Sequence, residues 1–107
     1  MALITLEEAK EYLRVSTSDE DALISSLISA AEILTRDTGR ISDETWAAVI
    51  AEPDPEEPEE ISSIRSVCWV AVLYAMAYLF EHREEADHHD LMITMRNLLC
   101  AIREGVV

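Results

Sequence analysis

An uninterrupted run of fourteen apolar residues, from Val67 to Phe80, constrains this chain more than any other feature. The run contains no charged residue, no Gly and no Pro. A membrane-spanning helix needs about 20 such residues, so the run is too short to cross a bilayer. A helix that is apolar on every side has to be covered on every side, and the rest of a chain of 107 residues offers little cover. The run therefore predicts contact with another subunit.

The charge of the chain limits its partners. There are 22 acidic and 8 basic residues, which gives a formal net charge of −14. Such an excess of acid opposes binding to a phosphate backbone and favours basic partners, or a surface that must not hold DNA. Half of the residues are apolar, which is ample for one folded domain over residues 1–107. The acidic, amphipathic N-terminus does not resemble a signal peptide, so we expect synthesis in the cytoplasm.

The hydrophobic periodicity predicts an all-α fold. Only two Gly occur, and the three Pro all lie between residues 53 and 58. Long patterns with a period of 3.6 residues indicate a compact bundle of about five helices with one long apolar central helix. We expect the first helix to begin at the capping box of Thr5 and Glu8, and the second to run from just after Ser18 to a C′ residue at Gly39. A short third helix is capped by Ser42 or Asp43. The fourth runs from Pro58 or Glu59 to Glu85, and the fifth from residues 87–90 to Gly105.

A segment rich in acid and proline, residues 51–60, separates the third and fourth expected helices. It holds three Pro and six acidic residues. This composition predicts a stiff, extended and solvated surface loop. Too little chain lies on either side for two cores, so the loop belongs to one domain.

The fourth expected helix has two apolar faces. The longer stripe is the better candidate for the chain's own core and consists of Ile61, Ile64, Cys68, Val72, Ala75 and Leu79. The opposite face, which we assign to a subunit interface, consists of Val70, Leu73, Tyr74 and Ala77. Arg65 and Arg83 flank the apolar run, where each either solvates a helix end or pairs with acids of a neighbouring subunit. The alternative is that the chain covers both faces itself.

The motifs that could carry chemistry are incomplete. The spacing Glu85-x-x-His88 occurs in carboxylate-bridged di-metal bundles, but no second copy is present. The chain has neither a Gly-x-Ser-x-Gly elbow nor a Gly-rich phosphate loop. We therefore expect no enzymatic activity, no cofactor and no metal site. We also expect Cys68 and Cys100 to be buried free thiols.

Several segments, in order, resemble the small head–tail connector proteins of long-tailed bacteriophages and prophages. The resemblance covers most of the chain except roughly residues 41 to 60. It is carried by Ile4–Val15, Asp19–Ile24 with Leu27-Ile28 and Ala30-Ala31, Thr38-Gly39-Arg40, Ile64–Tyr78 with Glu81–Glu84, and more loosely by Leu98-Leu99 with Arg103.

The resemblance implies a helical structural subunit of a homo-oligomeric ring beneath the portal. Such a ring joins the filled head to the tail or stopper proteins and lets DNA pass without specific binding. The protein would reside in the virion, at the head–tail junction, with no membrane contact. Two other classes remain as alternatives: an acidic regulatory module that binds a basic partner, and a metal-dependent helical nucleotide hydrolase that uses Glu81, Glu84, Glu85 and Asp87.

Overall fold

A computed structural model describes residues 3–82, 88–100 and 102 of the chain. These residues form helices and no strand, which confirms the predicted all-α fold. The five helices, in chain order, are α1 (Leu6–Leu13), α2 (Asp21–Gly39), α3 (Asp43–Ile50), α4 (Glu59–Glu81) and α5 (His89–Leu99).

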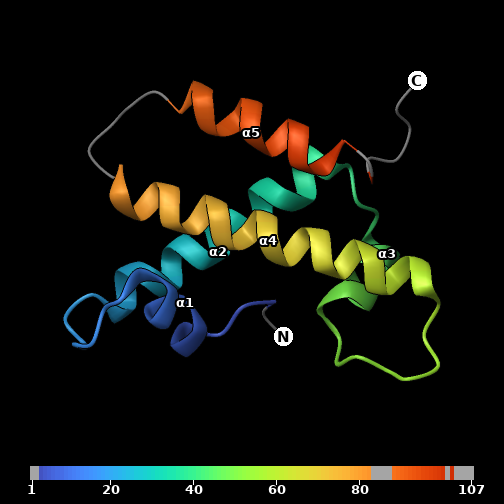
Figure 1. The fold of residues 1–107 in the computed structure, drawn as a ribbon, viewed down its shortest axis with the longest axis horizontal. Helices are drawn as coiled ribbons and strands as arrows, with labels where there is room; N and C mark the ends of the chain where they lie inside the picture. The colour runs from blue at the N-terminus through green and yellow to red at the C-terminus, as the bar shows by residue number, and fades with distance from the viewer. Residues whose placement is uncertain (1–2, 83–87, 101, 103–107) are drawn as a thin grey trace.

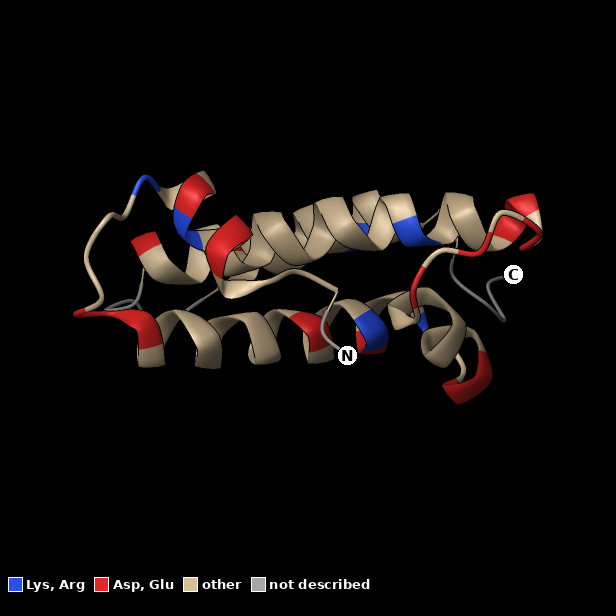
Figure 2. Cartoon of the chain, turned by 90° about the horizontal axis from the view of Figure 1, so that it is seen from below, with Lys and Arg blue, Asp and Glu red and all other residues tan. Residues whose placement is uncertain are grey.

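Helix α4 is the centre of the fold. It crosses the middle of the molecule, with α1 and α5 on opposite sides of it (Figure 1). It contacts all four other helices, and its contact with α2 is the largest. Figure 2 shows α2 and α4 running in two stacked layers, which agrees with a shortest dimension of 18 Å. The prediction of one long apolar central helix is thus confirmed.

Local capping signals explain where two of the helices begin. The backbone N–H of Glu8 donates to Thr5 Oγ1 (3.1 Å), and the N–H of Thr5 donates to Glu8 Oε1 (3.0 Å), which completes the expected capping box. At α3, the N–H of Thr45 donates to Ser42 Oγ at 3.2 Å. Both caps satisfy backbone donors that the first turn of a helix leaves open.

The end of α2 differs from the expectation. Gly39 is the last helical residue rather than the residue after the helix, and Arg40 takes the left-handed conformation with φ 52°. A Cβ at Gly39 would lie 3.3 Å from the Ile41 side chain, which would have to shift by a few tenths of an ångström, and in ordinary contact with Leu99 at 3.7 Å. The left-handed position is thus occupied by a residue with a Cβ, which is less favourable than glycine.

Three helices are shorter than expected. Helix α2 begins at Asp21 after Glu20, which forms no side-chain cap. Helix α4 ends at Glu81 instead of Glu85, and residues 83–87 lie outside the described part of the chain. Helix α5 ends at Leu99, and the expected stop at Gly105 also lies outside it.

The core lies between α2, α4 and α5. Its main cluster includes Ile24, Ile28, Val72, Met76, Leu91, Met95 and Leu99, all nearly or fully buried. A second cluster of Ile41, Val49 and Cys68 joins α3 to α4. The N-terminal segment is fixed as well, since the N–H of Leu3 donates to Glu32 Oε2 at 2.8 Å and Ile4 is buried.

By length and composition alone, α4 is long and apolar enough to cross a membrane, and 39% of its most apolar window is buried. The whole helix has 23 residues, more than the fourteen of the apolar run. A core helix of a soluble protein satisfies the same criteria. In the structure α4 packs against four other helices.

Candidate subunit interface

The four apolar residues expected at a subunit contact differ in how far the chain covers them. Leu73 and Ala77 are each only 8% exposed, and Tyr74 is partly buried. Val70 is 48% exposed, and its neighbour Trp69 is 37% exposed. The chain therefore covers much of this face itself, while Trp69 and Val70 remain open. That these residues meet another subunit stays a prediction.

The opposite stripe of α4 forms the chain's own core, as expected. Cys68, Val72 and Ala75 are fully buried, while Ile64 and Leu79 are partly buried and pack against the core clusters. Helix α1 packs against α4 and α2 and contributes Leu6, Leu13 and the buried Ala9.

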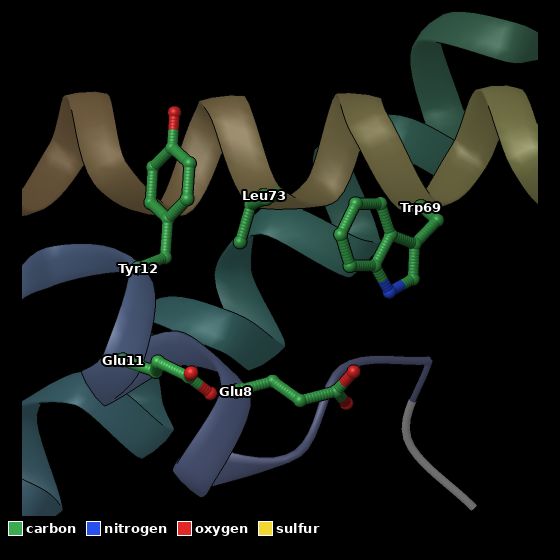
Figure 3. Close-up of a pocket in the computed structure, with 5 residues that line it drawn as sticks. All are labelled: Glu8, Glu11, Tyr12, Trp69 and Leu73. Atoms are coloured by element: carbon green, nitrogen blue, oxygen red, sulfur yellow. The ribbon is translucent and has the colours of Figure 1, made fainter.

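A shallow hollow of about 240 Å³ lies between α1 and α4. Figure 3 shows Leu73 between the rings of Tyr12 and Trp69, with the carboxylates of Glu8 and Glu11 on the α1 side. Tyr12 is 54% exposed and Trp69 is 37% exposed, so both rings are open to solvent. We call this hollow the groove; it is lined by Glu8, Glu11, Tyr12, Trp69 and Leu73. It combines an apolar floor with an acidic edge.

Arg65 is engaged within the chain. Its guanidinium forms an ion pair with Glu57 and donates to the carbonyl oxygens of Val49 and Ala48, both at 3.0 Å. The acid that Arg65 was expected to find on a neighbour is thus supplied by its own loop. A role of Arg65 at a subunit contact stays a prediction, and Arg83 lies outside the described residues.

The same contact changes the acidic loop. Glu57 also accepts from the hydroxyl of Ser62, and its N–H donates to the carbonyl of Asp54 at 3.0 Å, so the loop closes in a turn. The hydrogen bond from Arg65 is the main cause that lowers the pKa of Glu57 from 4.5 to about 2, and the Ser62 hydroxyl adds to it. Glu57 in turn raises the pKa of Arg65. The expected extended loop is therefore anchored at one acidic residue.

The residues considered for metal chemistry are only partly described. Glu81 is exposed at the end of α4, whereas Glu84, Glu85 and Asp87 lie outside the described residues. Within the described ranges, no three His, Cys, Asp or Glu side chains gather as a metal site would require. His82 and His88 instead contact Tyr78, whose ring stacks on His82 at 4.1 Å between centroids and meets His88 edge-on at 6.0 Å.

The two cysteines differ, and one expectation is wrong. Cys68 is fully buried in the α3–α4 cluster, and this burial raises the pKa of its thiol to about 11. Cys100, expected to be buried, is exposed. It follows the last residue of α5, so the helical pattern that suggested burial does not extend to it.

A second exposed surface was not anticipated from the sequence. Two hollows, of about 280 and 470 Å³, share Asp37 and Arg40 as lining residues. Around them lie Ile33, which is 67% exposed, and three of the six described Lys and Arg residues. We call this surface the arginine face; it consists of Ile33, Arg36, Arg40, Met92 and Arg96. Ile33 lies one turn before Arg36 on α2 and about two turns before Arg40, the residue that follows the helix, and this spacing was the available signal.

Comparison with known proteins identifies a family. The family model described as phage gp6-like head-tail connector protein matches residues 3–103. No curated protein and no solved structure matches the chain significantly. The family match covers all five helices and the loop between α3 and α4, including the segment where the sequence resemblance was absent.

Proposed function

The chain belongs to the family of phage gp6-like head-tail connector proteins, and from this membership we propose that its copies form a ring that joins the portal of the filled head to the tail. Membership makes the chain a structural, non-enzymatic component of the head–tail junction of a phage particle. In the proposed ring, DNA passes through the centre without specific binding, and the neighbours are portal and tail or stopper proteins. The observation that carries the proposal is the family match over residues 3–103.

Two features of the chain support this role. Trp69 and Val70 are exposed apolar residues on the central helix of the fold, and burying a large apolar side chain is worth about 1.5–3 kcal/mol. The charge of −14 opposes retention of DNA by the protein surface. Figure 2 shows acidic residues gathered at α1, at the start of α2 and at the loop between α3 and α4. Part of this acidic surface would face the channel.

The oligomeric state of the full chain tests the proposal. Light scattering across a concentration series gives the mass, and negative-stain images show whether an open centre is present. We expect closed oligomers that do not shift duplex DNA in a gel at low salt. A chain that stays monomeric at every concentration and salt condition, or that binds DNA tightly, would contradict the ring.

A matched pair of variants separates interface from core. Val70→Asp changes a residue that is 48% exposed and should reduce the oligomer mass while leaving the helical dichroism intact. Leu73→Asp places a charge at a position that is 8% exposed and should also destabilise the monomer. Unfolding of both variants would show that the Val70 side of α4 is needed for the monomer itself.

A further inference from the structure

We propose that neighbouring copies of this chain join head to tail, the groove of one copy receiving the arginine face of the next. This inference rests on the ring proposed above and names the two surfaces that form its repeated contact. The occupant of the groove is thus a second copy, and the contact centres on Ile33 of one copy and Trp69 of its neighbour.

The groove offers an apolar floor and uncompensated acid. Glu11 forms no ion pair with any described residue, and only one oxygen of Glu8, Oε1, is used in the capping box. Between these carboxylates and the aromatic rings, Leu73 forms the floor (Figure 3). A complementary partner must therefore combine an apolar side chain with guanidinium or ammonium groups.

The arginine face has this combination. Ile33 is the most exposed large apolar residue among those described, at 67%. Arg40 and Arg96 are exposed and form no ion pair with a described residue, whereas Arg36 pairs with Asp43. Asp37 is the acid within the two hollows, so Arg40 and Arg96 together outweigh it there. On a chain with a net charge of −14, this is an unusual concentration of positive charge.

The groove and the arginine face are complementary both in charge and in their apolar side chains. Arginine forms paired hydrogen bonds with carboxylates, which suits Arg40 and Arg96 to Glu8 and Glu11. Guanidinium groups also stack favourably on Trp and Tyr rings, both of which are present in the groove. An exposed aliphatic side chain that fills an aromatic-lined pocket is a common energetic centre of protein interfaces.

The positions of the two surfaces fit a head-to-tail contact. The groove lies between α1 and α4, while the arginine face lies along the C-terminal half of α2 and α5. Figure 1 shows α1 and α5 on opposite sides of α4. Two different surfaces on opposite sides give a heterologous contact, which leaves one groove and one face free at the ends of a chain of copies and closes into a ring when the rotation fits.

A mixing experiment tests the pairing directly. Trp69→Glu blocks the groove and Ile33→Glu blocks the arginine face; both positions are exposed, so the fold should persist, as dichroism can verify. Each variant alone should be monomeric by light scattering. An equimolar mixture should form dimers and nothing larger, because one intact groove meets one intact arginine face. The remaining groove and the remaining face each carry an introduced glutamate at the centre of the contact, and these two charges repel each other.

The chain provides a matched control for the charge component. Arg14 and Arg40 are both exposed, both follow a helix and both adopt the left-handed conformation. Arg40→Glu and Arg14→Glu therefore change net charge and backbone strain equally. We expect Arg40→Glu to weaken self-association roughly tenfold or more, as loss of an interfacial charge pair does, and Arg14→Glu to change it much less.

The outcomes distinguish this inference from the ring itself. If the wild type assembles and Ile33→Glu or Arg40→Glu assembles equally well, the pairing is overturned and the ring proposal stands. Monomers that do not combine in the mixture would also overturn the pairing. A wild-type chain that is monomeric under all conditions would overturn both proposals. If this monomer also shifts duplex DNA in a gel, and Arg40→Glu abolishes the shift, the arginine face would be assigned to nucleic acid.

Discussion

Arg65 and Glu57 form an ion pair that ties the acidic loop to α4 across eight positions of sequence. Nη2 of Arg65 donates to Glu57 Oε1 at 2.9 Å and to the Ala48 carbonyl oxygen at 3.0 Å, and Nε donates to the Val49 carbonyl oxygen at the end of α3. A single side chain therefore connects α3, the loop and α4. Each partner has little exposed side-chain surface, 15% for Arg65 and 13% for Glu57.

The pair makes stability depend on acid pH. Since the pKa of Glu57 is lowered from 4.5 to about 2 in the folded chain, its contribution is fully present above pH 4.5 and is lost as the pH falls through 2. Glu57→Gln should lower stability at pH 7 and flatten its decline between pH 4.5 and 2. Urea midpoints measured from pH 7 to pH 2 check this. Glu56→Gln, an exposed neighbour in the loop, should leave the profile unchanged.

The cysteines should differ in reactivity. Cys68 is buried and its pKa is raised to about 11, so almost no thiolate is available at pH 8, whereas Cys100 is exposed. A chromogenic disulfide reagent should modify Cys100 alone in the native chain and both cysteines in guanidinium. Cys100→Ser should abolish the native reaction. Rapid native labelling of that variant would show that the α3–α4 cluster opens easily.

The left-handed arginines predict stabilising substitutions. Arg14 has φ 59° and Arg40 has φ 52°, conformations that glycine adopts without a Cβ clash. Arg14→Gly and Arg40→Gly should each raise the free energy of unfolding by about 0.5–1 kcal/mol, because relief of the steric penalty of the left-handed conformation exceeds the extra backbone entropy that glycine loses on folding. Denaturant titration of the monomer measures the change. Equal stabilisation with weaker assembly only for Arg40→Gly would agree with the pairing of groove and arginine face.

Salt should strengthen assembly. Each copy carries a formal charge of −14 and extends 39 Å in its longest dimension, so most charges of two neighbours lie far apart. Their repulsion is screened when the Debye length falls from about 30 Å at 0.01 M to about 10 Å at 0.1 M salt. Charge pairs in close contact are screened less. Oligomer mass measured against salt should therefore rise over this range, and dissociation on adding salt would contradict it.

The sequence predicted those features whose signals are local. The capping box of Thr5 and Glu8 and the Ser42 cap need only three residues of separation, and both are present. The match between Arg65 and Glu57 was missed because it depends on how a loop with three prolines returns to α4. The conformation of Arg40 was missed because glycine is the usual occupant of the left-handed position after a helix, and here that position falls on the residue after Gly39.

The exposed part of α4 could not be located from its own residues. Every position from Val67 to Phe80 is apolar, so periodicity within the run distinguishes no outer face. The distinction arises from the packing of the other helices against α4, which leaves Leu73 and Ala77 buried but Trp69 and Val70 open. Likewise, the arginine face joins residues of α2 and α5 that are more than fifty positions apart in sequence.

Glu8 has two structural roles, of which Glu11 has only one. One of its oxygens closes the capping box with Thr5, while its side chain also lines the groove. A substitution at Glu8 therefore alters the start of α1 and the charge of the groove together, whereas a substitution at Glu11 alters only the charge. Evolution can therefore change the charge of the groove at Glu11 without affecting α1, whereas a change at Glu8 also weakens the start of α1.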